Sequence, residues 1–175
     1  MEKGRRFASV RPDGSICVGT DPEIGRLETY VECFAPLHGL REMYLEVARL
    51  KPEIEQDGLT TKQIETCAER KLREAGITRL SEEEFDRQTK GWAALYVYVG
   101  IVRAPSASPP KYYVYSIYIQ LHQDAFLVRE PDAGTPVITW WTAGFGGADN
   151  LNTVRVQVEG SLDDFVSAYL SINPK

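Results

Sequence analysis

The chain has 175 residues, of which 43% are hydrophobic and 26% are charged, and its formal net charge is −5. This composition suits one folded domain with a hydrophobic core and excludes global disorder. The acidic balance argues against nucleic acid as a partner, because phosphate-binding surfaces carry a basic excess. No stretch approaches the roughly 18 uninterrupted apolar residues of a membrane-spanning helix, so we expect no integral membrane segment.

The beginning of the chain and its cysteines bear on the compartment. Residues 1–10 are charged and lack the apolar core of a signal peptide, so we expect a cytoplasmic protein, with export as the alternative if a native leader is missing. The three cysteines, Cys17, Cys33 and Cys67, contain no CxxC pair and predict neither a metal site nor a disulfide scaffold. We expect free thiols, with a Cys17–Cys33 bridge as the alternative in an oxidising compartment. No cofactor is predicted.

The N-terminal part predicts an extension to the main domain. Residues 7–20 favour a β-hairpin, because a Pro-Asp-Gly turn separates two short runs with apolar residues. A further strand is predicted over residues 27–34. We therefore divide the chain into an N-terminal hairpin or extension, residues 1–39, and an α+β domain, residues 40–175.

The most strongly determined element is a helix over residues 60–75. Thr60 and Gln63 form a T-x-x-Q capping box, and Gly76 occupies the position at which helices commonly end. Apolar residues recur at helical spacing on one side, as expected for a face that packs on a core: Ile64, Cys67, Ala68, Leu72 and Ala75.

Alternating apolar residues predict several strands around this helix. The predicted strands cover residues 40–50, 77–80, 95–103, 112–128 and 137–143. The fourth alternates over so many residues that we expect a bend or bulge near Gln123–Asp124. A short helix is predicted from the capping box at Ser81. A turn is expected over residues 131–136 and a loop over residues 144–150.

The last segment is open to two interpretations. Its apolar residues fit one helical face over residues 151–171, and we favour one long helix. Residues 153–159 also alternate, which allows a strand followed by a shorter helix from residue 161. Both alternatives end in a helix before Asn173-Pro174.

These elements predict a single α+β domain. We expect a mainly antiparallel, twisted sheet of about five or six strands, with two main helices, 60–75 and 151–171, packed on one face. The other face would then carry many of the aromatic residues. Trp140 and Trp141 are adjacent, so a regular strand must direct them to opposite faces.

Two kinds of site are compatible with these residues. Tyr118, His122 and Asp124 share one parity of the long strand and, with Trp140, are the candidate binding residues of a small pocket. Proton transfer would require a positioned substrate and a shifted pKa, so we predict no catalytic residue. The aromatic residues of the sheet can instead present a Tyr/Trp surface to a ligand, a lipid or a second subunit.

Several short stretches of the region 40–175 carry a resemblance to known proteins. They are Asp57–Thr60, Glu69–Ile77, Leu95–Val99, Val114–Ile117, Thr139–Trp140 and Ala168–Lys175. Together they resemble a family of small uncharacterised bacterial proteins, many of them exported. The resemblance implies an α+β fold and no established activity, and it favours export. The order of strands and helices is also similar to envelope adaptor domains, such as the lipoprotein of lipopolysaccharide transport.

We therefore predict a non-enzymatic binding or assembly module that uses its aromatic sheet face or a strand edge. Self-association, as in a homodimer, or a protein partner is expected. The alternative is a small enzyme or ligand carrier that binds a small molecule in a pocket near Tyr118, His122, Asp124 and Trp140.

Overall fold

The fold is taken from a computed structural model, which describes residues 6–10, 16–20, 35–88, 91–104, 112–127 and 129–174. β1 (Arg6–Val10) and β2 (Ile16–Thr20) form a two-stranded antiparallel sheet of their own, which confirms the predicted hairpin. The strand predicted over residues 27–34 lies outside the described residues. The division at residues 39 and 40 stays a prediction.

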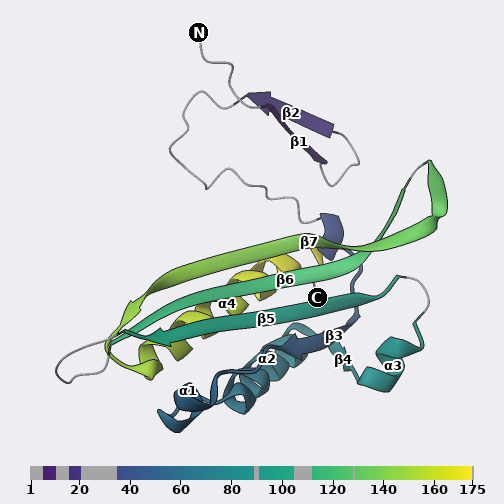
Figure 1. The fold of residues 1–175 in the computed structure, drawn as a ribbon. Coiled ribbons are helices and arrows are strands. Elements are labelled where there is room, and N and C mark those ends of the chain that lie inside the picture. The colour runs from purple at the N-terminus through teal and green to yellow at the C-terminus, as the bar shows by residue number, and fades with distance from the viewer. Residues whose placement is uncertain are drawn as a thin grey trace.

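The main sheet has five strands in the order β4-β3-β5-β6-β7 (Figure 1). Their bounds are β3 (Glu42–Val47), β4 (Thr78–Leu80), β5 (Ala93–Arg103), β6 (Tyr113–Leu127) and β7 (Glu130–Ala148). β3 runs parallel to both β4 and β5, whereas β5, β6 and β7 are antiparallel. The sheet is therefore mixed, which corrects the expectation of a mainly antiparallel one. Two helices connect β3 to β4, and a helical crossover of this kind allows the second strand to run parallel to the first.

Two long helices cover one face of this sheet, as predicted. α2 (Thr61–Ala75) packs near β3 and β4, and α4 (Leu151–Ile172) packs on β6 and β7. Figure 1 shows both helices behind the strands. Shorter elements complete the described part of the chain: a 3-10 turn (Ala35–Leu37), α1 (Pro52–Gln56) and α3 (Glu82–Asp86).

The ends of α2 are those that the sequence predicts. The Thr60 hydroxyl accepts from the Gln63 N–H at 3.2 Å, and the Gln63 side chain accepts from the Thr60 N–H at 3.0 Å. Gly76 ends the helix with a φ of 85°, in the left-handed region that glycine adopts without strain. Between these caps, Ile64, Ala68 and Leu72 are buried.

α4 is one continuous helix, so the favoured interpretation of residues 151–171 is confirmed and residues 153–159 are helical. Its N-cap is Asn150, whose side-chain oxygen accepts from the Thr153 N–H at 2.9 Å. Its inner face buries Val154, Val158 and Phe165 against the sheet.

β6 and β7 form a ribbon that is longer than predicted. Residues 131–136 and 144–148 belong to β7, so the turn and most of the loop expected there are wrong. The register shifts between Leu121 and His122 and between Phe126 and Leu127, on either side of the predicted irregularity. Prolines are tolerated because β7 is an edge strand.

The C-terminal end of α4 is tied to the segment that leads into β3. Asn173 donates from its amide to the Leu37 carbonyl at 2.9 Å and accepts from the Gly39 N–H at 2.8 Å. The Tyr169 hydroxyl donates to the Leu40 carbonyl at 2.8 Å. Leu37 itself is completely buried in the core, so these bonds close one corner of the five-stranded body.

Candidate functional site

The two faces of the sheet differ in what covers them. On β5 and β6, odd-numbered residues such as Leu95, Val97, Ile117 and Ile119 are buried against the helices. Even-numbered residues therefore point to the opposite side. We call that side of β5, β6 and β7 the open face. Its residues are Ala94, Tyr96, Tyr98, Gly100 and Val102 of β5, Val114, Ser116, Tyr118, Gln120 and His122 of β6, and Ile138, Trp141, Ala143, Phe145 and Gly147 of β7.

The strand register arranges the rings of the open face in neighbouring rows. Tyr98 lies opposite Tyr118, and their ring centroids are 6.0 Å apart. In the next row, Tyr96, Gln120 and Trp141 lie side by side across the three strands. Such cross-strand pairs fix the positions of the rings relative to one another. The open face therefore presents ordered aromatic groups on a rigid sheet.

From the row of Val102 and Val114 to His122, the open face carries no Asp, Glu, Lys or Arg, although a quarter of the chain is charged; Asp124 follows on the same side of β6, beyond the register shift. Its rings are nevertheless exposed, with Tyr118 at 40%, Trp141 at 51% and Phe145 at 89% relative exposure. Val102, Val114 and Ile138 add exposed apolar groups at the same side. Contiguous apolar surface of this kind marks interaction sites more often than it marks ordinary solvent-exposed surface.

The structure brings three of the four candidate binding residues to one side of β6. Tyr118, His122 and Asp124 share its even parity, whereas Trp140 pairs with the buried Leu121 and packs on Phe165 of α4 at 5.2 Å. The four residues therefore do not surround one pocket. His122 Nε2 lies 3.2 Å from Gln120 Oε1, and its ring meets the edge of Tyr96 at 6.2 Å. Their role in binding stays a prediction.

Sequence reasoning missed an aromatic cluster beside the open face, at β3 and α3. The Tyr44 ring stacks on Phe85 at 4.8 Å, and Phe85 meets the edge of Trp92 at 5.5 Å. Burial, and next the charge of Glu82, raises the pKa of the Tyr44 hydroxyl. A signal was available, because Phe85 is the one apolar residue in the acidic sequence of α3. The cluster holds α3 against the sheet.

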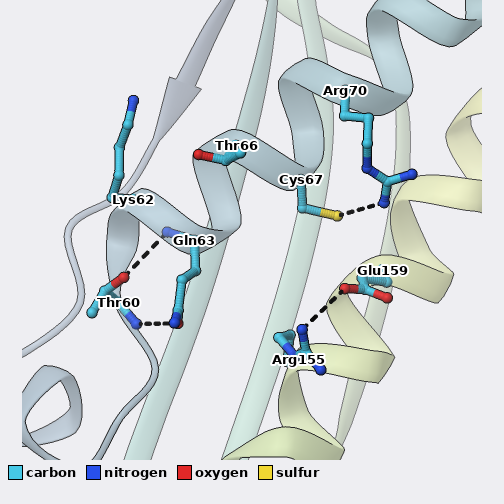
Figure 2. Close-up of a pocket in the computed structure, with 8 residues that line it drawn as sticks. All are labelled: Thr60, Lys62, Gln63, Thr66, Cys67, Arg70, Arg155 and Glu159. Carbon is cyan, nitrogen blue, oxygen red and sulfur yellow. Dashed lines mark hydrogen bonds and ion pairs between the residues drawn. The ribbon is translucent and has the colours of Figure 1, made fainter.

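A shallow depression lies on the other side of the molecule, between α2 and α4 (Figure 2). It has a volume of about 390 Å³ and is lined by Thr60, Lys62, Gln63, Thr66, Cys67, Arg70, Arg155 and Glu159. Its arginines are engaged, Arg70 with Glu74 at 3.4 Å and Arg155 with Glu159 at 3.9 Å. Burial raises the pKa of the Cys67 thiol, which disfavours a reactive thiolate. The depression is therefore poorly suited to bind an anion through its arginines or to react with an electrophile through Cys67.

The described residues also bear on metal and membrane binding. Within the described ranges, no three His, Cys, Asp or Glu side chains gather as a metal ion would require. None of the helices described is long and apolar enough to cross a bilayer. The Cys17–Cys33 alternative lies outside the described side chains, and Cys67 is a free thiol. The choice between a cytoplasmic and an exported protein stays a prediction.

Comparison with known proteins gives weak likenesses only. No family model and no curated protein matches the chain. Among solved structures, a minor lipoprotein from Acinetobacter baumannii is 11% identical with a TM-score of 0.32, covering 77% of this chain and 94% of that one. The rare lipoprotein B from Shewanella oneidensis is 7% identical with a TM-score of 0.35, covering 75% and 92%. A putative neuraminyllactose-binding hemagglutinin homolog from Helicobacter pylori is 11% identical with a TM-score of 0.39, covering 75% and 83%. Likenesses at this level carry no functional argument.

Proposed function

We propose that this protein is a non-enzymatic binding or assembly module whose contact surface is the open face. One observation carries the proposal: an exposed sheet surface that holds several Tyr, Trp and Phe rings and, from the row of Val102 and Val114 to His122, no Asp, Glu, Lys or Arg. Aromatic residues are enriched and charged residues depleted at the centres of protein interfaces, because burying a ring gains more than burying a charge.

Rigidity supports the same proposal. The rings of the open face stand on strands held by continuous antiparallel pairing, from Ala93↔Gln123 to Arg103↔Tyr113 and on to β7. A preformed surface binds without first ordering loops, so little binding free energy is spent on conformational entropy. No arrangement of a base, a nucleophile and an orienting group is seen at the His122 end of the face, where His122 contacts Gln120 and Tyr96.

Affinity capture with three matched proteins tests the proposal. The face variant is Tyr118→Lys, which introduces a charge at the centre of the open face. The control is Val156→Lys, because Val156 is a similarly exposed apolar residue, at 49%, but lies on α4. We expect interactors that the wild type and the Val156→Lys variant retain and the Tyr118→Lys variant loses. Identical sets for all three proteins would refute a role for the open face.

A further inference from the structure

The outer edge of β7 is an unusual edge strand. β7 ends the sheet, and no strand in the described part of the chain pairs with its outer side. Natural edge strands are commonly protected from pairing with other chains by charged residues, prolines or bulges. In β7 such features occur only toward the beginning, where Pro131 and Pro136 stand and the register shifts opposite Leu121 and His122. From Val137 to Ala148 there is neither a charge nor a proline.

The direction of the backbone groups on this edge follows from one hydrogen bond. The Ala104 N–H donates to the Tyr112 carbonyl at 2.8 Å, in register with β5 and β6. Antiparallel strands direct successive residues to alternate neighbours, so even residues of β6 bond toward β5 and odd ones toward β7. Those odd residues pair with the even residues of β7 between Trp140 and Ala148. The odd residues of β7 therefore direct their N–H and C=O groups outward: Trp141, Ala143, Phe145 and Gly147.

We propose that a second copy of this chain pairs with the outer edge of β7 in antiparallel orientation, which joins two five-stranded sheets into one. The inference goes beyond the proposed function, because it concerns the outer strand edge and not the open face. A two-fold interface brings the same strand against itself, so it requires self-complementarity. β7 satisfies this requirement, because its uncharged part creates no repulsion between like charges when two copies meet.

The order of large and small residues supports pairing about a two-fold axis at Ala143. Trp141 of one copy then lies opposite Phe145 of the other on the open face, a cross-strand pair of rings. On the helix-facing side, Trp140 lies opposite Gly146 and Thr142 opposite Gly144. A Cβ on Gly144 would meet no atom within 4 Å, so there is room beside it for Thr142 of the other copy, whereas the Tyr115 ring of the same copy already occupies the space beside Gly146. Pairing also makes the two open faces continuous, which doubles the surface available to other partners.

Sedimentation analysis of the full chain across a wide concentration range tests the pairing. We expect the wild type to have twice the 19.7 kDa mass of one chain. Ala143→Pro removes an outward-directed N–H, and Ala143→Lys places two ammonium groups together at the axis. Each should weaken self-association by about tenfold or more. Ala143→Ser is the matched control and should self-associate like the wild type. Far-UV circular dichroism checks that all variants are folded, and Ala143→Lys gives an independent result if proline disturbs the strand.

Tyr98→Lys separates this inference from the proposed function, because Tyr98 lies on the open face two strands away from the edge. It should leave the dimer intact. A monomeric wild type, or a dimer that Ala143→Pro and Ala143→Lys do not weaken, would overturn the pairing. A dimer that only Tyr98→Lys dissociates would show face-to-face packing instead. A monomer whose Trp141, Ala143 and Phe145 amides resist hydrogen exchange would show that the chain covers its own edge. The capture experiment with Tyr118→Lys can succeed in each of these cases.

Discussion

The helix-covered and open faces of the sheet differ in which residue types they bury and which they expose to solvent. On the covered side, apolar residues are buried, and charged groups of the helices form ion pairs at the surface, such as Lys71 of α2 with Asp163 of α4, and Glu65 and Glu69 of α2 with Arg79 of β4. On the open side, the outermost groups are aromatic and aliphatic. Stability explains the first pattern, because burial of apolar area drives folding. It does not explain the second, since rings left in water contribute little. The difference therefore supports the proposal that the open face is the contact surface.

The largest expected effect comes from a charge on the covered side. Leu72 of α2 is 1% exposed, so Leu72→Asp buries a carboxylate without a partner. The cost should exceed about 4 kcal/mol, a large part of the stability of a typical domain. We expect no cooperative unfolding transition in a thermal melt followed by circular dichroism. Val156→Asp, at an exposed site, is the control and should melt nearly as the wild type does; equal melting of Leu72→Asp would contradict the packing of α2.

One phenylalanine from each face allows a direct comparison of what burial contributes to the free energy of unfolding. Phe165 is completely buried under Trp140, whereas Phe145 is almost fully exposed. Phe165→Ala should cost about 3–5 kcal/mol of unfolding free energy, through lost burial and a cavity. Phe145→Ala should change it by no more than about 0.5 kcal/mol, as at other exposed sites. Chemical denaturation measures both at low protein concentration, at which self-association makes no contribution. A costly Phe145→Ala would mean that another part of the chain covers its ring.

Two neighbouring glycines of β7, one on each face, allow the two faces to be compared by adding a single methyl group at each site. A Cβ on Gly146 would lie 2.8 Å from the Tyr115 hydroxyl oxygen, and Tyr115 is packed against the core. A Cβ on Gly147 would collide with Tyr112, whose ring is exposed and can move away. We expect Gly146→Ala to cost about 1–3 kcal/mol and Gly147→Ala less. Gly144→Ala, which meets no atom within 4 Å, is the control. Equal costs at all three sites would show that the tyrosine rings do not limit the strand.

The smallest effect concerns pH. The Thr61 N–H and hydroxyl donate to Glu55 Oε1 at 2.9 and 2.8 Å, and the backbone bond is the main cause that lowers the pKa of this carboxyl. A lowered folded-state pKa stabilises the fold above the unfolded pKa, and this contribution is lost as the pH falls through the folded value. The melting temperature of Glu55→Gln should therefore lie below that of the wild type at neutral pH and converge with it in acid.

Gln120 of the open face supplies the reference for that titration, because its side chain does not titrate. Gln120→Ala should leave the dependence of the melting temperature on pH unchanged. If Gln120→Ala altered this dependence as much as Glu55→Gln does, carboxylates of the helix layer would not be its source.

Local signals predicted the elements of the covered side well. The capping box at Thr60, the terminating Gly76 and the apolar spacing of α4 are each contained within a few neighbouring residues, so the sequence alone is sufficient to find them. The adjacency of Trp140 and Trp141 likewise predicts that they lie on opposite faces, and they do.

The errors arise where a residue's conformation is decided by a distant partner. Taken alone, Gly144, Gly146 and Gly147 predict a loop, but β6 pairs with them. The ring of Tyr115 lies beside Gly146 and the ring of Tyr112 beside Gly147, where they fill the space that a side chain would take. The parallel pairs of β3 depend on strand order, which no local pattern encodes. Trp140 lies on the side of the sheet away from Tyr118 and His122, because that side is set by its pairing with Leu121; the binding role of these residues stays a prediction.

The bonds of Asn173 have a practical consequence for engineering. Because Asn173 holds the segment around Leu37 and Gly39, the first and last described residues of the five-stranded body leave it at the same corner. Circular permutation succeeds when such ends are adjacent. A short linker from residue 174 to residue 35 should therefore permit new termini in an exposed connection elsewhere, and fluorophores attached near residue 35 or near residue 174 would report from one location.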